Sequence, residues 1–136
     1  MIKQKGQSAV ELAIILPTFF IFIFAIMYAG IMFMDYIQYS NAARAAARDI
    51  ALERDSTKRS YLIKDKTKLK NHAKPITTLY NADFEAKESE DGKNIEVTVR
   101  LERNDEDFPL LLNKFNFPPK ELVPISYTMP LEEAEE

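Results

Sequence analysis

One acidic residue near the N-terminus, Glu11, has the type and the position that most suggest a chemical role. It stands directly before an uncharged apolar run that starts at Leu12. A carboxylate at the edge of a bilayer core costs free energy unless it reaches water or finds a cation. Gly6 lies five residues before it, at the end of the short basic leader MIKQKG. The position of Glu11 therefore indicates a side chain that needs a partner.

The other chemistry-bearing residues do not form a catalytic constellation. The chain has one histidine, His72, and no cysteine, and it contains no Gly-rich phosphate loop. Glu85 and Glu102 fall on alternating strands, where they are expected to face solvent. A net charge of -3 argues against a dedicated nucleic-acid binder. We therefore predict no enzyme, no cofactor, no metal site, no small-molecule substrate and no nucleic-acid partner.

The apolar run from Leu12 to Met34 is long enough to cross a membrane. It contains no charged side chain, and at about 1.5 Å per residue it spans about 34 Å against a hydrocarbon core of about 30 Å. A buried core helix fits poorly, because so small a chain cannot surround this many Phe and Ile side chains. A removable secretory signal also fits poorly, because its apolar core is shorter. Pro17 should bend the helix within the membrane.

Charges near the ends of the run predict its orientation. Lys3 and Lys5 precede it, whereas Asp35 follows it directly. Positive residues stay preferentially on the cytoplasmic side. We expect a single-pass protein of the cytoplasmic membrane, with the N-terminus inside and the C-terminal domain outside.

Ser8 and Glu11 also fit a second interpretation that needs no partner. The pattern Ser-x-x-Glu before an apolar run is typical of a capping box, in which Ser8 caps the helix and Glu11 reaches back to its amide. This interpretation leaves Gly6 and the short leader unexplained.

The helix is expected to continue beyond the membrane, from near Ser8 to near Arg54. Its exposed half reads NAARAAARDIAL and carries a small-residue face. That face would pack on a partner helix or on the protein's own sheet, or it would simply favour helix formation. Its residues are Ala42, Ala43, Ala46 and Ala47.

A second amphipathic helix is predicted between Ser56 and Ala73, capped by Asp55 or Ser56. It is rich in lysine, so it would lie against anionic lipid headgroups, face an acidic partner, or be a solvated surface. Pro75 ends it.

Alternating side chains then predict a small antiparallel sheet of about three strands. Residues near 79 to 102 form a hairpin around Glu90-Asp91-Gly92-Lys93, and a third strand runs from Leu122 to Met129, where Pro124 confines it to an edge. The apolar segment FPLLLNKFNFPP between them covers the core or binds a neighbour. The fold class is therefore α+β and membrane-anchored.

Together, the segments GQSAVELAIILP, NAARAAARDIAL, IEVTVRLE and ISYTMPLEE resemble the TadE-like family of minor pilins, or pseudopilins, of tight-adherence (Tad/Flp) type IV pili. The resemblance implies that a prepilin peptidase cuts between Gly6 and Gln7. It also implies that Glu11, the fifth residue of the mature chain, pairs with the N-terminal amine of a neighbouring subunit.

The resemblance divides the chain into a leader (1–6), a transmembrane and stalk helix (7–55) and an extracytoplasmic domain (56–136). It implies a subunit that contacts membrane lipid and other pilin or pseudopilin subunits through the N-terminal helix, and that helps initiate or assemble an adhesive pilus or related secretion apparatus. The alternative is an unprocessed single-pass protein whose ectodomain binds or regulates an envelope partner.

Overall fold

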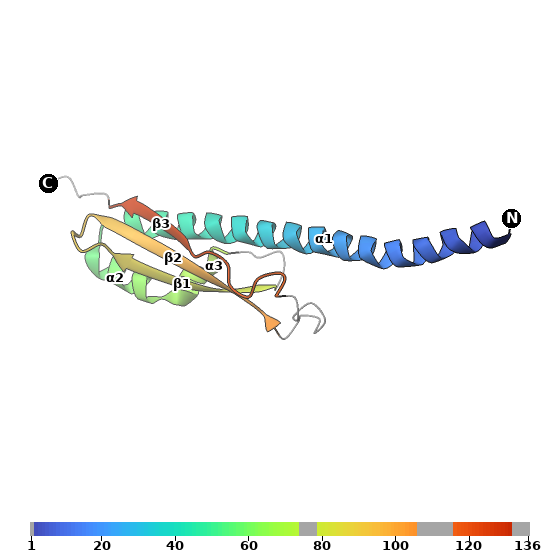
Figure 1. The fold of residues 1–136 in the computed structure, drawn as a ribbon. Helices are drawn as coiled ribbons and strands as arrows, with labels where there is room; N and C mark the ends of the chain where they lie inside the picture. Colours follow the sequence, from blue (N-terminus) through green and yellow to red (C-terminus); the bar gives the residue numbers. More distant parts are fainter. Residues whose placement is uncertain (1, 74–78, 106–115, 132–136) are drawn as a thin grey trace.

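The computed structural model describes residues 2–73, 79–105 and 116–131 of the chain. Its elements follow in the order α1 (Ile2–Leu52), α2 (Ser56–Lys64), α3 (Lys66–Asn71), β1 (Tyr80–Glu88), β2 (Asn94–Arg103) and β3 (Ile125–Pro130). The fold is α+β, as predicted. One long helix projects far beyond a small body that packs along its C-terminal part (Figure 1).

Helix α1 is continuous over 51 residues and passes through Pro17. At 1.5 Å per residue it is about 76 Å long. It starts at Ile2, six residues before the predicted start, and it ends at Leu52, close to the predicted end. The hydroxyl of Thr18 donates to the carbonyl oxygen of Ile14 at 3.3 Å, next to the position where Pro17 has no N–H to donate.

The sheet has three antiparallel strands in the order β1-β2-β3. In β1 and β2 the side chains alternate between the core and solvent as the sequence predicted. Tyr80 pairs with Arg103, and Glu88 pairs with Ile95 beside the hairpin turn. In that turn Gly92 has a φ of 65°, a conformation that glycine adopts without strain. Strand β3 is an edge strand and starts directly after Pro124.

The predicted second helix is two helices, because Asp65 interrupts it. The backbone N–H of Asp65 donates to the Tyr61 carbonyl at the end of α2, and its side chain accepts from the N–H of Lys68 at the start of α3. An aspartate that caps a new helix competes with continuation of the old one. Helix α2 starts after Asp55, whose carboxylate accepts from the N–H groups of Thr57 and Lys58, as the sequence predicted.

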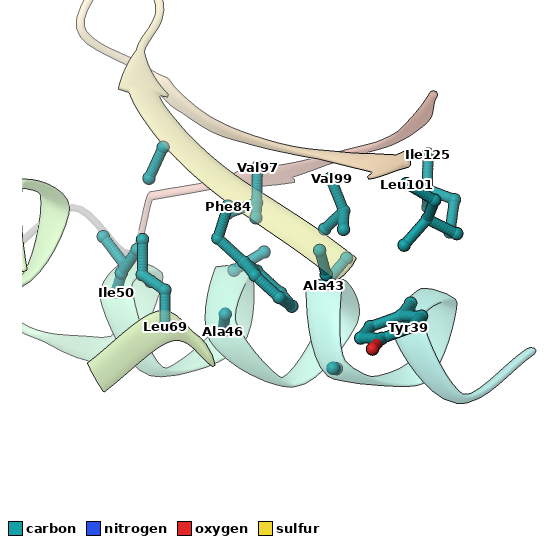
Figure 2. Packing of buried hydrophobic residues seen from close by; sticks show 14 of the residues in the cluster. Tyr39, Ala43, Ala46, Ile50, Leu69, Phe84, Val97, Val99, Leu101 and Ile125 are labelled. Atoms are coloured by element: carbon teal, nitrogen blue, oxygen red, sulfur yellow. The ribbon is translucent and has the colours of Figure 1, made fainter. Parts of the chain in front are cut away.

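The core lies between the inner face of the sheet and the second half of α1 (Figure 2). Phe84, Val97 and Val99 point from the sheet toward Ala43 and Ala46 on the helix, and Leu69 of α3 closes the side near Ile50. Val97 and Val99 are fully buried. Most of the apolar segment FPLLLNKFNFPP lies outside the described residues.

Candidate assembly helix and its junction with the sheet

The first turns of α1 contain the residues that the sequence linked to processing and assembly. Because α1 begins at Ile2, Ser8 is an interior helical residue and not the N-cap. The capping-box interpretation of Ser8 and Glu11 is therefore wrong for this helix. Glu11 is exposed, and one of its carboxylate oxygens accepts from the side-chain amide of Gln7 at 3.4 Å. So long a contact, made at the surface, is weak.

Gly6 has no structural reason to be a glycine. A Cβ built on it meets no heavy atom within 4 Å, and its φ is not positive. Glycine inside a helix costs about 1 kcal/mol relative to alanine. The chain therefore carries a destabilising residue at this position without gaining a close packing contact or a turn from it.

Most of the apolar half of α1 is uncovered by the other residues that the structure describes. Large hydrophobic side chains from Val10 to Met34 are exposed, many of them by more than half of their surface. Among the described residues, α1 is the one helix long and apolar enough to cross a membrane, and its most apolar window is not buried at all. An apolar surface of this size needs lipid or protein around it. The helix is compatible with a single-pass membrane anchor.

The alanine face lies beyond that segment and is covered by the protein's own sheet. The four alanines named above, 42, 43, 46 and 47, are at most 2% exposed and belong to the core. Small side chains let the helix approach the sheet closely enough for Val97, Val99 and Ile125 to fill the space (Figure 2). Of the alternatives that the sequence left open, the structure favours packing on the sheet. The alanine face is therefore not available to another chain while the sheet covers it.

A buried polar cluster joins α1 to the end of the sheet. Asp35, the first residue after the apolar run, has no exposed surface. One helical turn later, the Tyr39 hydroxyl donates to the carbonyl oxygen of Tyr80 at 3.1 Å. Burial raises the pKa of Tyr39, and the nearby Asp35 carboxylate raises it further. Burial raises the pKa of Tyr80 to about 12, although Arg103 partly opposes the shift and Asp35 adds to it.

Arg103 ties the end of β2 to the segment that leads into β3. Its side chain is almost completely buried, and it donates to the carbonyl oxygen of Pro118 at 2.6 Å and to the carboxylate of Asp105 at 2.9 Å. Its backbone N–H donates to the carbonyl of Lys120. The Tyr80 hydroxyl donates to the carbonyl of Pro119 at 2.8 Å. Together these bonds fix residues 118–120 against the start of β1 and the end of β2.

The sequence reasoning missed this junction, although a signal was present. Arg103 continues the alternation of Val97, Val99 and Leu101, all of which are buried. Asp35 precedes Tyr39, Ala42 and Ala46 at helical spacing on the same face of α1. If the apolar periodicity is extended to these charged positions, it predicts that Asp35 and Arg103 are both buried.

The lysine-rich helices lie beside the far part of α1. Arg59 of α2 donates to the carbonyl of Glu53 at 2.9 Å and lies 3.8 Å from the Glu88 carboxylate. Glu53 is about 28 Å along the helix axis from Met34, several times the distance over which salt screens charges. The start of α2 therefore cannot reach the headgroups of the membrane that α1 would cross. On α3, Lys66 forms an ion pair with Asp83 at 3.0 Å.

No group of three or more potential metal ligands occurs among the residues that the structure describes. The Nε2 atom of His72 lies 3.2 Å from the Asp49 carboxylate, and this contact joins the end of α3 to α1. The sheet's outer face carries Glu85, Lys87 and Arg100 in exposed ion pairs, which contribute little stability.

Comparison with known proteins agrees with the resemblance noted in the sequence. No curated protein and no solved structure shows significant similarity to the chain. The model of the TadE-like protein family matches residues 6–48, which is less than half of the 136 residues. The match starts at Gly6, includes the whole apolar run and the alanine face, and ends at Arg48. This family is structural and non-enzymatic, and it indicates a component associated with Tad pili. From Gly6 to Arg48, therefore, the chain is similar to the TadE-like protein family.

Proposed function

We propose that the chain is a minor pilin, or pseudopilin, that a prepilin peptidase cuts between Gly6 and Gln7. Residues 1–6 are the leader, and the mature subunit starts at Gln7. It then contacts other pilin or pseudopilin subunits through the exposed apolar half of α1, and it helps to initiate or assemble a Tad-type adhesive pilus or a related secretion apparatus.

Gly6 is the observation that carries the processing step. Packing does not explain it, because an added Cβ would meet open space. A peptidase must hold an extended backbone in its active site, and a residue without Cβ lets the backbone approach closely. Gly6 also lowers the cost of unwinding the first turns of α1 before cleavage.

Cleavage would change the surroundings of Glu11. A new α-amine would appear at Gln7, one helical turn before Glu11 on the same side of α1. The amide contact that Gln7 now gives Glu11 is long and weak. An amine from a neighbouring subunit would replace it with a charge-assisted pair at the edge of the bilayer, where such a pair is stronger than in water. The pair would set the axial position of one subunit against the next.

The charges near the ends of the apolar run support an orientation with the N-terminus inside. Lys3 and Lys5 hold the short N-terminal tail in the cytoplasm. The body begins directly after the apolar run, because Asp35 is already enclosed by the domain. With the N-terminus inside, the domain lies outside the cytoplasmic membrane, and α1 holds it there until assembly.

The mature N-terminus tests this proposal. Mass spectrometry of the protein from its native host should find a chain that starts at Gln7. Gly6→Val should leave the precursor uncut, because a β-branched side chain obstructs an extended active-site groove. Gly30→Val is the matched control, since Gly30 is also helical and also has open space around it.

An intact Met1 terminus in the presence of the peptidase would contradict the processing step and favour an unprocessed membrane protein. Equal cleavage of the Gly6→Val and Gly30→Val variants would show that Gly6 has no part in recognition.

A further inference from the structure

The domain is held very close to the end of the apolar run. Asp35 is fully buried, and the Tyr39 hydroxyl binds the backbone of Tyr80 at 3.1 Å. Tyr39 follows Met34 by five residues, which is about 7.5 Å of helix. The hydrocarbon core of a bilayer is about 30 Å thick and the whole bilayer about 40–45 Å, so each headgroup layer is about 5–7.5 Å deep. Tyr39 therefore lies at the outer boundary of the headgroups.

One edge of the domain lies at this level. Strand β1 begins and β2 ends at the end of the sheet that faces the N-terminal half of α1, and the segment leading into β3 lies at the same end (Figure 1). Residues 118–120 of that segment are bonded to Tyr80 and Arg103. We call residues 116–120 the membrane-proximal rim.

We propose that the membrane-proximal rim sits in the lipid headgroup layer of the membrane that α1 crosses. This proposal rests on the membrane anchor of the proposed function. The occupant of the rim surface is lipid, because α1 is continuous between the anchor and the junction and leaves no linker through which the domain could rise away.

The side chains of the rim suit that layer. Phe117 and Pro119 are half-buried and present apolar surface, and Lys120 is exposed. A lysine places its methylene groups along apolar surface while its ammonium reaches phosphate oxygens. The charges near the rim are of both signs, because Lys120 is followed by Glu121 and the buried Arg103 is paired with Asp105. Zwitterionic lipid should therefore be sufficient.

The rim is also held rigidly. The Tyr39 hydroxyl holds the start of β1, the Tyr80 hydroxyl holds Pro119, and Arg103 holds Pro118. These three bonds form a connected path from α1 to the rim. The depth of α1 in the membrane therefore fixes the depth of the rim.

The chain contains no tryptophan, so single tryptophans can report depth without further changes. The full-length protein is reconstituted in phosphatidylcholine vesicles that contain a fraction of lipid with a nitroxide on the headgroup. Phe117→Trp is the test variant, and Lys120→Trp is a second one whose exposed side chain leaves folding unaffected. Tyr61→Trp, on the exposed surface of α2, is the matched control. Phe19→Trp lies inside the apolar run. Quenching of its fluorescence by lipid with a nitroxide on the acyl chains shows that α1 is inserted in the bilayer.

We expect headgroup nitroxide to remove a large part of the fluorescence at positions 117 and 120 and none at position 61. Adding anionic lipid should not increase the quenching. Quenching at position 19 together with no quenching at 117 and 120 would overturn the rim proposal and leave the anchor intact. No quenching at position 19 would overturn the anchor, and the rim proposal with it. A blue-shifted but unquenched Trp at 117 would show that protein covers the rim, which also contradicts a lipid contact.

Discussion

Alkaline pH should destabilise the domain through the buried hydroxyl of Tyr80. This side chain is 2% exposed, and its hydroxyl donates to the carbonyl of Pro119 at 2.8 Å. Burial, with a contribution from Asp35, raises its pKa from 10.0 to about 12 in the folded state. At a pH between these two pKa values, the unfolded chain has lost the Tyr80 proton, whereas the folded protein still keeps it.

The sign of the effect follows from that difference. Below pH 10 both states are protonated and the stabilisation is fully present. As pH rises from 10 to about 12, the unfolded state binds fewer protons than the folded state, so the free energy of unfolding falls. A shift of about two units corresponds to a loss of about 3 kcal/mol, at about 1.4 kcal/mol per unit. Tyr39, whose pKa is also raised, adds to the loss.

Urea unfolding of the full chain in detergent, followed by the circular dichroism of the sheet, measures this loss. The free energy of unfolding should change little between neutral pH and about 10 and then fall steeply as the pH approaches about 12. Tyr80→Phe should start about 1 kcal/mol less stable, because it loses one hydrogen bond, and should show a smaller alkaline loss. Tyr61→Phe changes an exposed tyrosine and should behave like the wild type. An alkaline loss in Tyr80→Phe equal to that of the wild type would refute the assignment to this hydroxyl.

Three further substitutions test other parts of the helix and the body. Ala46→Leu places three extra carbons in the fully buried contact between α1 and the sheet, which should cost about 1–3 kcal/mol in urea unfolding; Ala45→Leu, on the half-buried flank, should cost less. Asp55→Ala removes the cap that accepts from Thr57 at 2.9 Å and should lower stability by about 1 kcal/mol, with faster amide exchange confined to α2; exchange spread over the sheet would contradict a local cap. Glu11→Ala should leave the protein in the membrane and reduce its co-purification with pilin partners, because an apolar side chain favours the bilayer but cannot pair with an amine. Normal co-purification would count against the role of Glu11.

The sequence predicted the sheet well because alternation is a direct consequence of strand geometry. Every second residue from Tyr80 to Ala86 and from Ile95 to Leu101 is apolar, and the structure buries them all. The apolar run was equally clear, since length and the absence of charge decide whether a helix can cross a bilayer. These features are local, so they can be read from neighbouring residues alone.

The break at Asp65 and the buried position of Arg103 depend on contacts that the local pattern does not contain. Asp65 lies in a stretch of continuous helical periodicity, and only its capping of Lys68 ends α2 there. The alternation of β2 places Arg103 on the inner face, but a charged side chain is expected in solvent. Arg103 can be buried because the carbonyl oxygen of Pro118, fifteen residues later, accepts a hydrogen bond from it. A buried charge is stable only where such partners exist. The alternation therefore predicted correctly that Arg103 points into the core, whereas its charge favoured the opposite prediction.

The continuity of α1 has a consequence for assembly. The segment that meets the membrane and the segment that forms the core are parts of one helix, with no hinge between Met34 and Asp35. The number of residues between Glu11 and the alanine face therefore fixes both the height and the direction of the domain, at about 1.5 Å and about 100° per residue. An ion pair at Glu11 that sets the axial position of a subunit would then also set where its sheet points. In a subunit built this way, the register chosen inside the membrane determines which face the domain presents outside.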